Sequence, residues 1–303
     1  MTSPLATEAA PFGRVLIAMV TPFTPEGELD LDAAAKLATH LVDSGADGIV
    51  VSGTTGESPT TTGEEDGRLL SAVLEAVGDR ATVVAGVGTN DTRHTVELAA
   101  QAVRLGAHGL LVVSPYYSKP PQSGLVANID AVIEVAGDTP IMLYDIIGRT
   151  GVEIAESTYA EFESRPTILA VKDASGDLAR AARLRANTRF ALYCGDDVLN
   201  LPYFALGAVG VVSVAGHVAG GQIKQLFDAV DAGDLARARE IDNEILPLTA
   251  AIMGQTQGAI AAKAAMVELG IIPSAAVRLP LTPATDDQVQ VIRTALKDAG
   301  LLA

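Results

Sequence analysis

Eight short runs of β-branched and other apolar residues recur along the chain, and their regular spacing is the feature that most limits its fold. The first run begins at Val15 and the eighth at Gly210, so one unit spans about 28 residues, which suits a strand followed by a helix. Apolar residues between the runs have helical spacing, as in 31–41 and 92–105. The predicted strands are 15–23, 48–54, 82–88, 109–117, 141–147, 168–175, 190–196 and 210–216.

Eight apolar strands joined by helices predict an α/β fold of the (β/α)8 TIM barrel type. Aromatic residues make up only 4% of the chain, so its core must come from Val, Ile, Leu and Ala, as in buried parallel strands. A doubly wound open sheet is the alternative. It usually has fewer strands, and the chain has neither G-x-G-x-x-G after the first strand nor a G-K-[ST] loop.

The strand rhythm stops after about residue 233. Three later segments have the pattern of helices, with Pro273, Pro280 and Pro283 marking loops: 234–252, 256–269 and 284–300. We therefore expect a disordered N-terminal tail (1–12), a catalytic barrel (13–233) and a C-terminal helical extension (234–303). The tail has no basic start and no apolar stretch, so it does not resemble a secretory signal.

The charge of the chain argues against several classes of partner. The formal net charge of −16 disfavours non-specific binding to nucleic acid or to an anionic membrane. The single cysteine, Cys194, excludes an internal disulfide, and the four histidines show no metal-binding spacing. No apolar run reaches the ~18 residues of a membrane span. We expect a soluble, cytoplasmic protein without nucleic-acid or membrane partners.

Active sites of such barrels lie where strands run into the following loops, and Lys172 is placed there. It follows four apolar residues on the sixth predicted strand, where a charged amine is costly unless it is paired or neutral. Desolvation that lowers a lysine pKa to ~7–8 makes the amine a nucleophile able to form a Schiff base with a ketone or aldehyde. The alternative is a structural ion pair with Asp173 or another barrel carboxylate.

Hydroxyl groups follow neighbouring strands. Tyr144 ends the fifth predicted strand, and its phenol could pass protons together with Thr54 and Tyr117. The alternative is that Tyr144 and Tyr117 are amphipathic caps of the core.

Two features could receive anions. The loop 53–56 contains two glycines, whose small size lets a carboxylate approach the backbone, although a plain turn has the same sequence pattern. Arg149, in a glycine-flanked loop, could clamp a second carboxylate or be merely solvated. Together these residues describe covalent chemistry on a keto acid without a metal. Of the histidines only His217 lies near a strand end, so we discount a metal-dependent aldolase. That class is not closed entirely, because four carboxylates follow the strands: Asp145, Asp173, Asp196 and Asp197.

Three motifs together resemble the pyruvate-dependent, Schiff-base class I aldolase family that contains dihydrodipicolinate synthase and N-acetylneuraminate lyase. They are GTTGE at 53–57, Y-x-x-x-x-RTG at 144–151 and VKD at 171–173. The similarity extends from about Gly13 to the C-terminus and includes LPLTP at 279–283. It implies a metal-independent lyase that needs no cofactor, because the substrate is held covalently.

The resemblance also implies residue roles. Lys172 would form the Schiff base with pyruvate, and Tyr144, Thr54 and Tyr117 would relay protons, with Tyr117 inserted from a neighbouring subunit of a homotetramer. Arg149 favours the synthase branch, in which an arginine receives the carboxylate of L-aspartate 4-semialdehyde during lysine and diaminopimelate biosynthesis. The remaining substrate-binding positions would be Gly53, Thr55, Gly195 and Val212.

The chain departs from the family pattern at three places. Ile147 replaces a proline that is usual before the arginine, and Asp145 stands where many members have Asn. The allosteric positions Ser58, Asn90 and Tyr116 suit an L-lysine site. The histidines and glutamate of lysine-inhibited members are replaced, however, and the aligned residues are Gly63, Asp66 and His94. We therefore expect weak or absent feedback by L-lysine.

Two other functions stay open at this stage. One is a different pyruvate-dependent class I aldolase or lyase acting on a sugar-like 2-keto acid. The other is a catalytically silent barrel that binds pyruvate, although such a protein needs neither Lys172 nor Tyr144.

Overall fold

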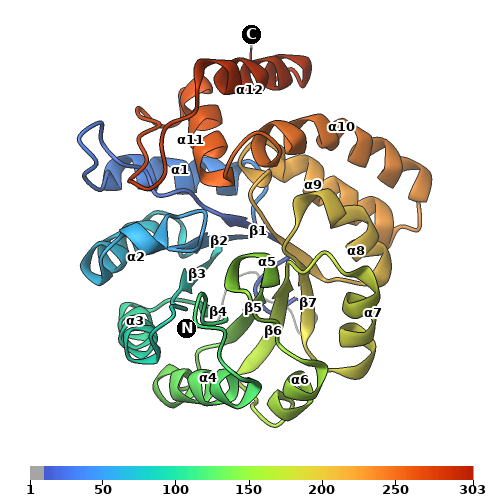
Figure 1. Ribbon diagram of the computed structural model, residues 1–303. Helices are drawn as coiled ribbons and strands as arrows, with labels where there is room; N and C mark the ends of the chain where they lie inside the picture. Colours follow the sequence, from blue (N-terminus) through green and yellow to red (C-terminus); the bar gives the residue numbers. More distant parts are fainter. Residues whose placement is uncertain (1–9, 303) are drawn as a thin grey trace.

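The computed structural model, which describes residues 10–302, is a closed barrel of eight parallel strands (Figure 1). Each strand pairs with the next along the chain, and the first pairs with the eighth. The predicted TIM barrel is therefore confirmed, and a doubly wound open sheet is excluded. The strands are β1 (Val15–Ala18), β2 (Gly48–Val51), β3 (Thr82–Gly86), β4 (Gly109–Val113), β5 (Ile141–Asp145), β6 (Ile168–Asp173), β7 (Ala191–Cys194) and β8 (Gly210–Ser213).

Helices surround the barrel, and α10, α11 and α12 form a C-terminal extension beside α1 and α9 (Figure 1). The predicted helix 92–105 has the same bounds as α3. Asp91 caps its first turn, and Gly106 ends it with a φ of 88°. The helices are α1 (Leu31–Asp43), η1 (Ser58–Thr60), α2 (Gly63–Val77), α3 (Thr92–Leu105), α4 (Gln122–Ala136), α5 (Ile147–Thr150), α6 (Glu156–Phe162), α7 (Leu178–Asn187), η2 (Asp197–Leu199), α8 (Asn200–Leu206), α9 (Gly216–Asp231), α10 (Leu235–Met253), α11 (Gly258–Glu268) and α12 (Asp286–Asp298).

The strands are shorter than predicted, and the excess lies mainly at their C-terminal ends. The predicted strands 15–23 and 109–117 end at Ala18 and Val113. Beyond these points the chain turns into the loops of the barrel mouth, and Tyr117 has a φ of 74°, which an L-residue cannot adopt in a strand. Apolar composition alone does not distinguish a strand from the loop that continues it.

The bottom of the barrel is closed by Phe12, which has no exposed surface. Its ring meets that of Tyr193 edge-on at 6.2 Å between centroids. The Tyr193 hydroxyl accepts from the Phe12 amide (3.2 Å) and donates to the carbonyl of Gly13 (2.9 Å). The packed chain therefore begins before Gly13, earlier than the expected boundary of the tail. Residues 1–9 of the expected tail lie outside the described residues, and the division into parts stays a prediction.

Within residues 10–302, no helix combines the length and the apolar character needed to cross a bilayer.

Buried charges join the extension to the barrel. Lys263, on α11, is fully buried, forms an ion pair with Glu57 and donates to the carbonyl of Ala276 (2.7 Å). Burial lowers the pKa of the Lys263 ammonium to about 8, while the nearby carboxylate acts in the opposite direction. The second oxygen of Glu57 accepts from the backbone N–H of Arg278 (2.9 Å). One carboxylate from the loop after β2 thus holds two segments of the extension.

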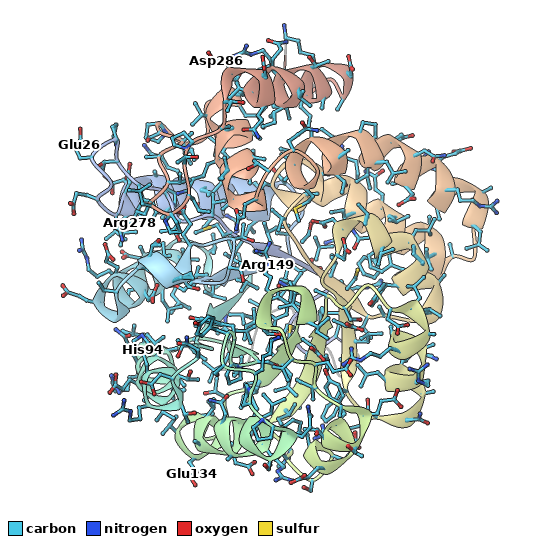
Figure 2. The ribbon with its side chains drawn as sticks, in the orientation of Figure 1. Glu26, His94, Glu134, Arg149, Arg278 and Asp286 are labelled. Atoms are coloured by element: carbon cyan, nitrogen blue, oxygen red, sulfur yellow. The ribbon has the colours of Figure 1, made fainter. Side chains whose placement is uncertain are left out.

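Arg278 extends the same network to the loop before α1, to η1 and to α2 (Figure 2). Its guanidinium binds both oxygens of Glu65 at 2.9 and 2.5 Å and donates to the carbonyls of Gly27 and Thr60 at 2.9 Å each. Hydrogen bonding to Arg278 holds the pKa of Glu65 at about 2. The guanidinium lies 4.2 Å from the ring centroid of Phe23. The extension is consequently fixed to the loops that follow β1 and β2.

Replacing Lys263 by Met should leave the buried Glu57 carboxylate without its ion-pair partner. The free energy of unfolding should fall by about 3 kcal/mol, because an uncompensated buried charge is costly. Urea unfolding followed by circular dichroism measures the loss. Arg293→Met is the control, because its pair with Glu268 is partly exposed and should contribute less than ~1 kcal/mol. Equal losses in the two variants would contradict the special cost of the Glu57 site.

Candidate active site

Tyr144 and Lys172 lie side by side because they are register partners on the neighbouring strands β5 and β6. The tyrosine belongs to the side-chain cluster that fills the barrel interior, and the lysine Nζ lies 3.9 Å from the centroid of its ring. An amine over the face of an aromatic ring is attracted by the ring electrons when it is charged. The structure thus brings together the two residues that the sequence singled out for chemistry.

Lys172 is 94% buried by side chains of the barrel, with a relative exposure of 6%. Within residues 10–302, no carboxylate lies within ion-pair distance of its amine. The neighbouring Asp173 points away from the barrel interior and pairs with Arg180 instead. A structural ion pair, the alternative considered for this lysine, is therefore not what the structure contains, and the amine is free to react.

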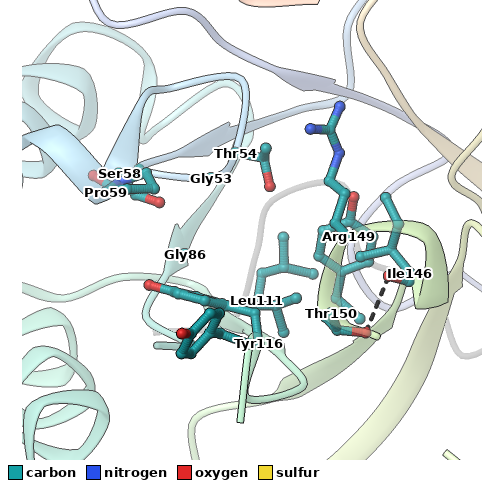
Figure 3. Close-up of a pocket in the computed structure, with 15 residues that line it drawn as sticks. Gly53, Thr54, Ser58, Pro59, Gly86, Leu111, Tyr116, Ile146, Arg149 and Thr150 are labelled. Atoms are coloured by element: carbon teal, nitrogen blue, oxygen red, sulfur yellow. Dashed lines mark hydrogen bonds between the residues drawn. The ribbon is translucent and has the colours of Figure 1, made fainter. Parts of the chain in front are cut away.

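A cavity of about 260 Å³ opens at the mouth of the barrel beside Tyr144 (Figure 3). Its size suits a small organic acid rather than a polymer. The loops after β2, β3, β4 and β5 form its walls, and Thr54, Arg149 and Tyr117 all reach it. The lining residues are Ser52, Gly53, Thr54, Ser58, Pro59, Gly86, Gly88, Leu111, Val113, Tyr116, Tyr117, Tyr144, Ile146, Arg149 and Thr150.

The loop 53–57 is held in a conformation that its own sequence would not select. Ser52, just before the loop, and Glu57, its last residue, have φ values of 52° and 59°, in the left-handed region. The Thr21 hydroxyl donates to the carbonyl of Gly56 at 2.6 Å, and Glu57 is tied to the extension by Lys263. Strain of this kind persists only where the surroundings fix it, and it is common at ligand sites.

The threonines of this loop differ in access. Thr54 lines the cavity, and so does the backbone of Gly53. Thr55 is buried and lies outside the set of cavity-lining residues.

Arg149 stands exposed on the short helix α5, over the centre of the barrel (Figure 2). Within the described part of the chain its guanidinium has no ion pair and no side-chain hydrogen bond. An arginine that is left free beside a cavity is available to bind a carboxylate with two hydrogen bonds.

Tyr117 is also exposed, with 88% of its surface accessible. It therefore does not cap the core of its own chain, whereas Tyr144 does contribute to the interior. Thr54, Tyr144 and Tyr117 line one cavity, but no hydrogen bond joins their hydroxyls among residues 10–302.

Gly195 and Val212 lie next to this site without lining its cavity. A Cβ added to Gly195 would stand 3.1 Å from Cγ of Lys172 and 2.9 Å from Cβ of Ala174, so glycine leaves room for the lysine stem. Val212 is fully buried in the interior cluster that contains Tyr144. Gly195 thus leaves space beside the stem of Lys172, and Val212 packs within the same interior as Tyr144.

Ser58 and Tyr116 line the same cavity, whereas Asn90 lies exposed in the loop after β3. Asp66, one of the three positions at which the chain departs from the expected L-lysine site, is turned inward. It accepts from the hydroxyls of Ser52 and Thr61 at 2.8 Å each.

The two departures near β5 are compatible with an intact site. Asp145 faces away from the cavity and is paired with Arg180, so its charge is balanced outside the barrel interior. Ile147 occupies the first position of α5, where a proline would lose no helical hydrogen bond. The turn closes without proline, because Arg149 and Thr150 donate to the carbonyl of Ile146 at 3.0 Å each.

Among the described residues no group of three or more His, Cys, Asp or Glu side chains is arranged to hold a metal ion. His217 is buried and already engaged, since one ring nitrogen accepts from the amide of Val20 (3.2 Å) and the other contacts the carbonyl of Val214 (2.8 Å).

Three residues that support the site were not identified from the sequence: Lys263, Arg180 and the carboxylate of Glu57. Lys263 is the only charged residue in the otherwise small and apolar stretch 258–267, and a buried amine in such a helix is a detectable signal. Arg180 carries no local signal, because α7 contains other arginines that are exposed.

We expect Ile147→Pro to stabilise the protein by about 0.5 kcal/mol, because proline restricts the unfolded chain and fits the first position of a helix. The midpoint of urea unfolding measures the gain. Ile147→Ala is the control, since it removes the same side chain without fixing φ. A proline variant less stable than the alanine variant would show that this backbone does not accept proline.

Comparison with known proteins matches this architecture. The profile of the Dihydrodipicolinate synthetase family matches residues 11–299. The chain is 54% identical to the 4-hydroxy-tetrahydrodipicolinate synthase of Kineococcus radiotolerans, over 99% of this chain and 97% of the relative. It is 56% identical to the enzyme of that name from Acidothermus cellulolyticus, over 96% and 94%. A crystal structure of DHDPS from Cyanidioschyzon merolae with lysine bound superposes with a TM-score of 0.92 at 44% identity, covering 96% of this chain and 99% of that one.

Proposed function

This chain belongs to the dihydrodipicolinate synthetase family, and we propose that it is a 4-hydroxy-tetrahydrodipicolinate synthase, a lyase of the class I aldolase type. It condenses pyruvate with L-aspartate 4-semialdehyde in lysine and diaminopimelate biosynthesis. The observation that carries the proposal is the contact between Lys172 and Tyr144, because Tyr144 lines an open cavity and the amine of Lys172 lies against its ring, although Lys172 itself is not a lining residue. The buried amine has no ion-pair partner within residues 10–302, as a Schiff-base nucleophile requires.

The first half of the reaction activates pyruvate. Nζ of Lys172 adds to the ketone carbon, and the ketone oxygen leaves as water, which gives a protonated imine. Loss of a proton from the methyl group turns the imine into an enamine. These steps need a group that gives and takes protons, a role proposed for the Tyr144 phenol together with Thr54 and with a Tyr117 inserted from a neighbouring subunit.

The second half joins the substrates. The enamine carbon attacks the aldehyde carbon of the semialdehyde, and the resulting alkoxide takes a proton to become the hydroxyl group. The amino group of the acceptor then displaces Lys172 from the former ketone carbon and closes a six-membered ring. Lys172 is regenerated as the free amine, one water is released in total, and neither metal nor cofactor is required.

Two carboxylates need separate receivers. The loop 53–55 is proposed to hold pyruvate through Thr55 and the backbone of Gly53, and Gly195 and Val212 are proposed to bound the pyruvate site. The free guanidinium of Arg149 is proposed to bind the carboxylate of the semialdehyde. Arg149 is the feature that favours this acceptor over others. The second candidate, a lyase acting on a sugar-like 2-keto acid, differs from the first in its acceptor.

The proposed assembly is a homotetramer in which Tyr117 enters the site of a neighbouring subunit. Its 88% exposure and left-handed backbone support this role, because a large ring held out into solvent gains from burial against a partner. The cytoplasmic location stays a prediction.

A coupled assay tests the activity. Pyruvate and L-aspartate 4-semialdehyde are supplied, and a downstream reductase reports product by nicotinamide oxidation. We expect turnover that needs both substrates, and at least a thousandfold loss in Lys172→Ala at unchanged circular dichroism. Turnover only with another aldehyde acceptor would support the second candidate. A folded wild type that neither turns over nor retains pyruvate after borohydride reduction would indicate a silent barrel.

L-Lysine at millimolar concentration should leave turnover nearly unchanged. Gly63 replaces an interface side chain, and Asp66 is occupied by two hydroxyls of its own chain. The same coupled assay with a lysine titration measures the effect, and half-inhibition below about 1 mM lysine would refute the expectation.

A further inference from the structure

Two carboxylates lie on the outer face of β5 and β6, directly after Tyr144 and Lys172 in the sequence. Asp145 follows Tyr144 on β5, Asp173 follows Lys172 on β6, and the two aspartates are register partners. Successive side chains of a strand point to opposite faces, so the aspartates face outward towards the helices. Neither has any exposed surface.

Arg180, in the first turn of α7, bridges these carboxylates. One terminal nitrogen of its guanidinium donates to Oδ2 of Asp145 and, at 2.9 Å, to the carbonyl of Ile154. The other donates to Oδ1 of Asp173 at 3.4 Å. Only 8% of the arginine side chain is exposed. A single cation therefore spans the two strands directly behind the reactive residues.

Neutral donors bind the same two carboxylate oxygens as Arg180, whereas Oδ1 of Asp145 and Oδ2 of Asp173 are buried without a hydrogen bond within residues 10–302. Oδ2 of Asp145 accepts from the Tyr159 hydroxyl (3.1 Å) and from the amide of Ile154 (3.0 Å). Oδ1 of Asp173 accepts from the amide of Ser175 (2.9 Å). Among the described residues, no cation other than Arg180 forms an ion pair with either carboxylate. Removal of Arg180 therefore leaves two buried like charges on adjacent strands.

We propose that Arg180 is a positioning residue that holds the ends of β5 and β6 together and thereby keeps the Lys172 amine against the Tyr144 ring. The proposal rests on the roles that the proposed function gives to those two residues.

The backbone transmits this constraint over a short path. The amide of Ala174 donates to the carbonyl of Asp145 at 2.9 Å, which links the strands one residue beyond the reactive pair. Repulsion between unpaired carboxylates acts at the same level and opposes that bond. Displacement of reacting groups by about 1 Å lowers rates by about a hundredfold in other enzymes. The 3.9 Å contact between amine and ring is therefore sensitive to the loss of the bridge.

The test measures reductive trapping of pyruvate on Lys172 with borohydride, located by peptide mass. In Arg180→Met, the trapping rate at saturating pyruvate should fall about tenfold or more. The pyruvate concentration for half-maximal trapping should stay within about threefold, because loop 53–57 does not contact Arg180. Adding Asp145→Asn removes one of the two charges and should restore most of the rate. Arg183→Met, whose exposed pair with Glu156 lies on the same helix, is the control and should trap as the wild type does.

Wild-type trapping in folded Arg180→Met, or no recovery in the double variant, overturns the proposal. Arg180→Lys keeps the charge but cannot bridge both carboxylates, so it should trap at an intermediate rate. It replaces Arg180→Met if that variant does not fold, and a wild-type rate in it also overturns the bridge. A wild type that is not labelled at Lys172 refutes the proposed function, and the positioning role with it.

Discussion

The alternation of side chains along β5 and β6 is the constraint on which the site depends. It turns Tyr144 and Lys172 into the barrel and, in the same step, turns the two following aspartates outward under α7. The same register of β5 and β6 therefore sets both the contact between Lys172 and Tyr144 inside the barrel and the charge network outside it. A one-residue shift that moved Asp173 into the place of Lys172, or Asp145 into the place of Tyr144, would put a carboxylate inside the barrel, so the contact depends on the register of both strands.

Buried charge serves different ends in two parts of the molecule. The Glu57–Lys263 pair ties a strained loop to helices of the extension, whereas Arg180 lies between strands of the barrel itself. In both places a cation reaches its partner from a helix, which can move little without losing packing. Lys172 is the buried cation-forming group that lacks such a partner among residues 10–302, and this contrast with Lys263 supports the role proposed for it.

The barrel and the place of its mouth could be predicted because their signals are local: apolar runs, helical spacing and glycine at helix ends. Lys172 could be singled out for the same reason, as a charge on an apolar run. The C-terminal ends of the strands could not, because the loop residues that follow are equally apolar and are defined by φ values such as that of Tyr117. The partners of Arg180 and Lys263 could not be assigned, because Asp145 lies 35 residues from Arg180 and Glu57 lies 206 residues from Lys263 along the chain. The inward turn of Phe12 was likewise invisible, since its contact with Tyr193 spans 181 residues.

The separation of Glu57 from Lys263 also orders events during synthesis. Chains grow at about 5 to 20 residues per second, so the 206 residues between the two partners take on the order of 10 to 40 s to appear. During that interval the eight strands have been made, but the loop that borders the cavity lacks the cation that holds it. All eight strands of a nascent chain are thus synthesised before the loop 53–57 can form its ion pair. The loop can reach its final conformation only once α11, which carries Lys263, has been translated.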